Sequence, residues 1–101
     1  MFKKSKTRDI EALVRESCDL AQSMIADLRQ SDPSNETFGQ AGLLNGKDIV
    51  SEYLDHGELG CALSHVLYMV HESAISFPKE KAVELHEIAK TIGEPISYVI
   101  E

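Results

Sequence analysis

The sequence predicts an all-α fold: a compact bundle of four to five helices with an αα-hairpin around Gly57. Three observations lead to this prediction. Apolar residues recur at steps of three and four along most of the chain, which is the period of an amphipathic helix. A glycine or a proline follows each of these stretches, where helices commonly end. No stretch alternates apolar and polar residues for long enough to predict a pair of strands.

The first helix is expected over residues 7–30. Thr7 is the expected N-cap, and Arg29 in the last turn suits the negative end of the helix dipole. Residues 1–6 are expected to form a flexible basic N-terminus, and residues 30–46, rich in glycine and small polar residues, a long loop. The apolar stripe of this helix consists of Ile10, Leu13, Val14, Cys18, Ala21, Ile25 and Leu28.

A short second helix and a longer third helix are expected on either side of Gly57. The second spans residues 47–56, with Asn45 as its N-cap. Gly57 ends it because glycine adopts the left-handed conformation of a helix C′ position without a Cβ penalty. The third helix, residues 58–73, follows at once, so the two helices are predicted to form an αα-hairpin.

A fourth helix is expected over residues 78–92. Pro78 suits its first turn, and Gly93 with a proline two residues later marks its end. The apolar residues 95–101 are expected to pack across the bundle, as a short helix or strand. The whole chain, residues 1–101, is therefore predicted to be one helical domain.

Composition and patterning indicate a soluble, cytoplasmic protein. Hydrophobic residues make up 43% and charged residues 27% of the chain, the balance of an ordinary globular domain. No apolar run approaches the roughly twenty residues of a membrane span, and the basic start leads into no apolar segment of a secretory signal. Cys18 and Cys61 both fall on apolar stripes, so we expect two reduced core residues and no disulfide.

The charge of the chain is unevenly distributed. The net charge is −7, yet the first eight residues hold four bases and no acid. From Asp9 onward, seventeen acids stand against six bases, which gives this part a net charge of −11. Such a body disfavours direct binding to the anionic backbone of nucleic acids and suits association with a basic protein. The alternative is that the charge only keeps a small protein soluble.

Residues 53–72 hold the residue types that metal sites and acid–base catalysis use. Only Cys61 and His65 share a helix face, at a spacing of four residues. His71 lies about 120° further round the same helix, and His56 belongs to the preceding helix. Because a metal site needs three or four converging ligands, the sequence predicts none here.

No catalytic arrangement is evident either. Glu58 and Glu72 lie about 21 Å apart along their helix, too far for either carboxylate geometry of a glycosidase. The chain contains no Walker loop and no GxGxxG, HExxH or CxxC pattern. We therefore predict no enzymatic activity, no metal and no cofactor. A metal-binding regulator that uses Cys61, His65 and His56 is kept as an alternative.

The acidic residues of the second helix form a clearer pattern. Asp48, Glu52 and Asp55 fall at i, i+4 and i+7, on one helix face. No lysine or arginine lies three or four residues from any of them, so their repulsion costs roughly a few tenths of a kcal/mol per pair. We predict that these acids and Tyr53, a residue type enriched at interface centres, bind a partner. The alternative is a merely solvated face with Tyr53 in the core.

Residues 48–93 also carry an ordered set of motifs. The short acidic helix ends in YLxHGE (Tyr53–Glu58), GxAL (Gly60–Leu63) opens the longer helix, and IxF (Ile75–Phe77) precedes the last amphipathic helix. In this order the segment resembles the small helical immunity proteins of bacterial polymorphic toxin systems, nearest to the Maf-type immunity proteins and their relatives in contact-dependent growth inhibition. The first helix and the long loop have no counterpart in this resemblance.

The resemblance implies an inhibitor that binds a cognate bacterial toxin domain, commonly a nuclease, and neutralises it by protein–protein contact inside the producing cell. An acidic body suits this role because a nuclease presents a basic substrate groove. The alternative function is a helical regulatory adaptor or self-associating module without a toxin partner. Its groove would involve Met24, Met69 or the apolar residues 95–101. The oligomeric state is not predicted.

Overall fold

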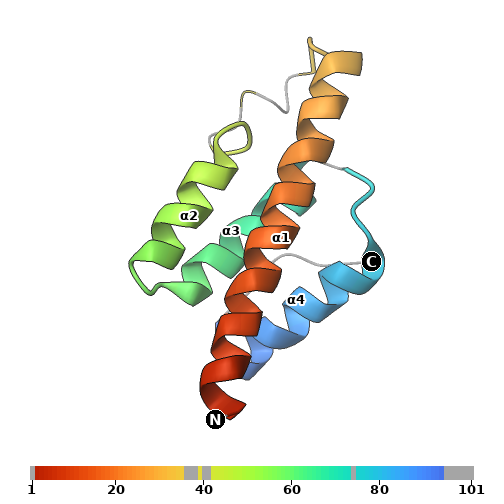
Figure 1. Cartoon of the computed structure of the whole chain (residues 1–101). Coiled ribbons are helices and arrows are strands. Elements are labelled where there is room, and N and C mark those ends of the chain that lie inside the picture. Colours follow the sequence, from red (N-terminus) through yellow and green to blue (C-terminus); the bar gives the residue numbers. More distant parts are fainter. Residues whose placement is uncertain (1, 36–38, 40–41, 74, 95–101) are drawn as a thin grey trace.

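Four helices make up most of the described chain (Figure 1): α1 (Phe2–Ser31), α2 (Gly46–Asp55), α3 (Leu59–Ser73) and α4 (Lys79–Thr91). The computed structural model describes residues 2–35, 39, 42–73 and 75–94, and no strand occurs among them. The predicted all-α bundle is therefore confirmed. The prediction for residues 95–101 lies outside the described residues.

The first helix is longer than predicted. α1 begins at Phe2, so Thr7 lies inside the helix and is not its N-cap. The backbone of residues 2–6, predicted as a flexible terminus, is helical. The physical reason is that this segment contains no glycine or proline and is rich in lysine, a good helix former, so nothing local delays the start of the helix. Thirty helical residues span about 45 Å.

The other three helices pack against this long helix. Figure 1 shows α1 running the length of the molecule, with α2 on one side, α4 on the other and α3 behind. The molecule measures 48 × 27 × 19 Å along its principal axes, so its longest dimension is close to the length of α1. The chain directions of α1 and α2 are opposite.

The core lies where α3 meets the other helices. Its fully or nearly buried members are Val14, Cys18, Ala21, Ile25, Leu43, Val50, Leu54, Ala62, Leu63, Val66, Leu67, Met69, Val70, Leu85 and Ala89. Burial raises the pKa of the Cys18 thiol to about 11, which keeps it protonated and unreactive. The prediction for Cys61 is wrong, because this thiol is exposed. It lies about 100° from Ala62 round α3, beyond the edge of the buried side.

Gly57 ends α2 as predicted and turns the chain into α3. Its φ angle is +72°, the left-handed conformation that glycine adopts most easily. The backbone N–H of Glu58 donates to the carbonyl of Tyr53 at 2.8 Å, and that of Gly57 donates to Leu54 at 3.1 Å. These two bonds form a Schellman motif, which satisfies carbonyls at the end of α2. The predicted αα-hairpin is therefore confirmed.

The start of α2 is fixed differently from the prediction. Asn45 occupies the N-cap position, but its side chain makes no capping hydrogen bond. Instead, the side chain of Gln22 on α1 bridges two backbone groups. Its Oε1 atom accepts from the N–H of Lys47 at 3.0 Å, and its Nε2 atom donates to the carbonyl of Leu43 at 3.2 Å. A residue of α1 thus stabilises the first turn of α2.

His65 of α3 holds the end of the same loop. Its Nε2 atom donates to the carbonyl of Gly42 at 3.0 Å, and the imidazole is partly buried. Gly42 has a φ angle of +87°, and a Cβ atom added there would lie 2.7 Å from Cε1 of His65. The loop therefore approaches the His65 ring closely at a position where only glycine fits without strain.

We expect Gly42→Ala to lower the free energy of unfolding by about 2–3 kcal/mol, of which about 1 kcal/mol comes from the left-handed backbone and the rest from the contact with His65. Gly57→Ala is the matched control: its φ angle is also positive, but a Cβ atom there meets nothing within 4 Å. It should cost only about 1 kcal/mol. Urea unfolding of both variants gives the difference. Equal costs would show that His65 does not restrict the loop.

Candidate functional site

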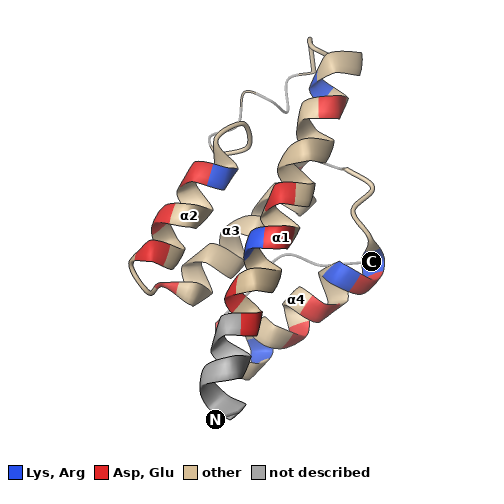
Figure 2. Cartoon of the chain, viewed as in Figure 1, with Lys and Arg blue, Asp and Glu red and all other residues tan. Residues whose placement is uncertain are grey.

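The three predicted acids lie together on the outer side of α2. Asp48, Glu52 and Asp55 are all exposed, while Val50 and Leu54 on the opposite side of the helix are buried. At 100° per residue the three acids fall within an arc of about 60°. Figure 2 shows the acidic residues of α2 one above the other along its length. The structure therefore brings the three predicted carboxylates onto one surface, which we call the acidic face.

One of these carboxylates has a partner on α1. Nη2 of Arg15 donates to Oδ1 of Asp55 at 3.3 Å, with 44% and 69% of the two side chains exposed. One of the three acids therefore does have a cationic partner. Helical spacing on α2 did not reveal this partner, because it lies 40 residues away in the sequence. Asp48 and Glu52 form no ion pair within the described part of the chain.

A second ion pair also links the two helices. Nζ of Lys47 lies 3.3 Å from Oδ1 of Asp19, and both side chains are more than half exposed. Each of these exposed pairs contributes about 1 kcal/mol or less to stability. Together with the two hydrogen bonds of Gln22 they fix how α2 lies on α1. The acidic face is thus carried by a helix that is held at both ends.

The end of α2 lies in a negative electrostatic environment. Nδ1 of His56 hydrogen-bonds to the carbonyl of Glu52 at 2.8 Å. This hydrogen bond is the main reason that the pKa of His56 is raised, and the carboxylates of Glu52, Glu58 and Asp55 raise it further. His56 therefore takes up a proton more readily than a free imidazole does.

Tyr53 is not part of the acidic face. It lies about 140° from Asp48 round α2, and its partly buried ring packs against the hydrophobic core. The sequence left open whether Tyr53 lies at a partner interface or in the core, and the structure favours the position beside the core. The four residues predicted to bind a partner are therefore divided, with three acids on the surface and one aromatic ring packed inward.

The residues considered for a metal site have separate partners. His65 bonds to Gly42, and His56 bonds to the backbone of its own helix. Nδ1 of His71 lies 2.9 Å from the carboxylate of Glu72. Among the residues that the structure describes, no group of three or more His, Cys, Asp or Glu side chains is placed to hold a metal ion.

A second acidic triplet, on α4, shows what distinguishes the acidic face. Glu80, Glu84 and Glu87 have the same spacing as the acids of α2 and are also exposed. Lys81 and Lys90 lie three residues from Glu84 and Glu87, at neighbour spacing on the helix, although Lys81 forms its ion pair with Glu16 of α1. Figure 2 accordingly shows basic and acidic residues mixed along α4. Lysines at this spacing are missing on α2, where Asp55 is instead paired with Arg15 of α1.

The residues suggested for the groove of an adaptor do not all lie at the surface. Met69 is fully buried and cannot line a surface groove. Met24 is partly buried and borders a cavity with Leu28 and Ile75. The remaining candidate, residues 95–101, lies outside the described residues.

Sequence reasoning missed the residues of α1 that hold α2. Arg15, Asp19 and Gln22 fall at i, i+4 and i+7, so they form a polar row along one side of an otherwise amphipathic helix. This row has the same spacing as the acidic face and contacts α2 at Lys47 and Asp55. The spacing was a usable signal, but the identity of the contacting helix depends on the tertiary fold.

The fold and the site together define a class: an all-α helical bundle with an exposed acidic face on a short helix. No helix in the described ranges is both long and apolar enough to cross a membrane. Comparison with known proteins places the chain in no family, since no protein-family model, no curated protein and no solved structure matches it.

Proposed function

We propose that this chain is an immunity protein that binds a cognate bacterial toxin domain, a basic nuclease, and neutralises it through the acidic face of α2. The observation that carries the proposal is the placement of Asp48, Glu52 and Asp55 on one exposed face, with no lysine or arginine three or four residues from any of them on the same helix. The motif order of residues 48–93 adds the resemblance to immunity proteins.

In this proposal the chain inhibits by occupying or shielding the toxin and needs no catalytic group or cofactor. A nuclease cleft collects cations to bind phosphates, and carboxylates on a protein surface compete for the same cations. A net charge of −11 from Asp9 onward would also steer a basic partner toward this protein and speed the encounter. Complex formation would take place in the cytoplasm of the producing cell, before the toxin reaches its substrate.

The contacts between α1 and α2 support this role. Arg15, Lys47 and Gln22 link the two helices through side chains, so α2 has a defined position before any partner arrives. A surface that is already ordered loses less conformational entropy on binding than a mobile one. The acidic face would therefore bind as a preformed surface, with a high association rate set by charge.

The test uses the protein encoded next to this chain. We expect the adjacent upstream reading frame to encode a larger protein with a basic terminal domain that kills cells lacking this chain and spares cells producing it. The association rate of the purified pair should fall at least tenfold between about 0.05 and 0.5 M salt. Absence of protection would contradict the immunity function, and a salt-independent rate would contradict the role of charge.

A further inference from the structure

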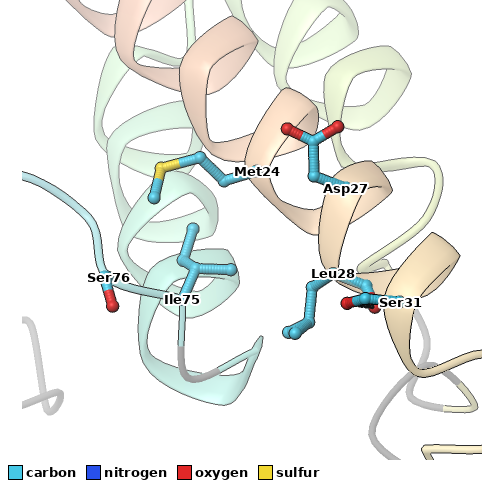
Figure 3. Close-up of a pocket in the computed structure, with 6 residues that line it drawn as sticks. All are labelled: Met24, Asp27, Leu28, Ser31, Ile75 and Ser76. Atoms are coloured by element: carbon cyan, nitrogen blue, oxygen red, sulfur yellow. Dashed lines mark hydrogen bonds between the residues drawn. The ribbon is translucent and has the colours of Figure 1, made fainter.

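A cavity of about 320 Å³ opens between the C-terminal half of α1 and the segment that joins α3 to α4. Figure 3 shows Met24 and Ile75 extending toward each other, with Leu28 directed at the same space. Asp27, Ser31 and Ser76 complete the lining. Three apolar and three polar residues therefore line the open space, and one of the polar residues, Asp27, carries a carboxylate.

The cavity lies where α1 extends past α4. The ion pair between Glu16 and Lys81, at 2.6 Å, places the first turn of α4 beside the middle of α1. Met24 and Leu28 lie about 12 and 18 Å further along α1. Figure 1 shows that α1 continues beyond the start of α4, where the segment joining α3 to α4 runs beside it on the side away from α2. None of the described residues takes the position that a fourth helix would occupy in this half of the bundle.

This site is separate from the acidic face. The side of α1 that contacts α2 carries Arg15, Asp19 and Gln22. Met24 lies about 180° from Arg15 round the same helix. The cavity therefore opens on the side of α1 that faces away from α2, and an inference about it does not depend on the proposed immunity function.

We propose that this cavity binds the apolar face of a basic amphipathic helix from a partner protein. A floor of Met24, Leu28 and Ile75 suits one or two aliphatic side chains, as in other helix-in-groove contacts. The methionine side chain can adapt its shape to different anchors. A helix laid here would continue the line of α4 along α1 and complete the bundle in its open half.

One feature at the rim selects a basic partner. The carboxylate of Asp27 is exposed and forms no ion pair within the described ranges. Arg29 in the last turn of α1 already suits the negative end of the helix dipole, so the charge preference comes from Asp27. This carboxylate favours a lysine or arginine next to the apolar anchor and disfavours an acidic residue there.

The experiment uses two designed peptides of equal helicity. The first carries leucines at i, i+4 and i+7 flanked by lysines, and in the second each lysine is replaced by glutamate. Each is titrated into the full chain with labelled methyl groups. We expect the basic peptide to shift the signals of Met24, Leu28 and Ile75 in a saturable manner. The acidic peptide should bind at least tenfold more weakly.

Two variants test whether Asp27 is responsible for the preference for the basic peptide. Asp27→Lys should weaken binding of the basic peptide roughly tenfold, because an attraction becomes a repulsion. Asp9→Lys is the matched control, since Asp9 is also exposed and lies on the same side of α1 about 27 Å away. It should change the affinity less than twofold. Circular dichroism of both variants checks that the helical fold is retained.

Three results would overturn the proposal. The first is no methyl shift at the cavity with either peptide at millimolar concentration. The second is equal binding of the basic and acidic peptides, or equal effects of Asp27→Lys and Asp9→Lys. The third is concentration-dependent self-association of the protein alone that shifts the same methyl signals, because the occupant would then be a second copy of this chain.

Discussion

Replacement of Asp48, Glu52 and Asp55 by lysine is expected to weaken toxin binding at least about a hundredfold while the protein stays helical. Each substitution turns an attraction to a cationic surface into a repulsion, and the three effects act on the same face. All three side chains are exposed, so the core is not changed. Losing the exposed Arg15–Asp55 pair should cost about 1 kcal/mol of stability or less. Isothermal titration calorimetry measures the affinity, and circular dichroism checks the fold.

The triplet Glu80, Glu84 and Glu87 provides a matched control on α4. Reversing it to lysine changes the net charge by the same amount, at the same helical spacing. Both triplets place one acid in the first turn of their helix, so the loss of its favourable interaction with the helix dipole is also matched. The control should retain affinity within about fivefold. An equal loss in both variants would assign the binding to net charge and remove the acidic face from the mechanism.

The parts of the fold that the sequence predicted are those fixed by local rules. Gly57 and Gly93 end their helices with φ angles of +72° and +77°, which follows from the conformational freedom of glycine alone. The apolar spacing of residues 59–73 identified the helix that supplies much of the core. The start of α1 was missed because capping preference at Thr7 is a weak signal compared with a continuous run of helix-forming residues.

The long loop shows why the contacts between distant parts of the chain could not be predicted from the sequence. Gln22 and His65 hold its end through contacts spanning 21 to 25 residues of sequence. The spacing of apolar residues indicates which side of a helix is buried. It does not indicate which polar residues of one helix will contact a loop or another helix. His65 was therefore considered as a metal ligand, whereas in the structure it anchors Gly42.

For the candidate site, too, the features set by a single helix were predicted and the contacts between helices were not. The common face of Asp48, Glu52 and Asp55 is a property of one helix and was predicted correctly from spacing. The pairing of Asp55 with Arg15 depends on how α2 lies on α1. The edge of a buried side is also hard to place, since a single step of 100° separates exposed Cys61 from buried Ala62.

Leu67→Ala is expected to lower the free energy of unfolding by about 3–5 kcal/mol. Leu67 is fully buried on α3, in the core shared by all four helices of the described chain. The substitution removes buried methyl groups and leaves a cavity that the surrounding helices fill only in part. Small domains have a total stability of about 5–15 kcal/mol, so this loss is a large share of it. Urea unfolding monitored by circular dichroism measures the change.

Leu44→Ala is the control for this substitution, because the same atoms are removed from a side chain that is 39% exposed. It should cost less than about 1 kcal/mol, since its side chain is partly in water already and little cavity forms. A loss below about 1 kcal/mol for Leu67→Ala as well would mean that α3 is not the central element of the core. The acidic face would then lack a rigid support, since α2 depends on that core through Val50 and Leu54.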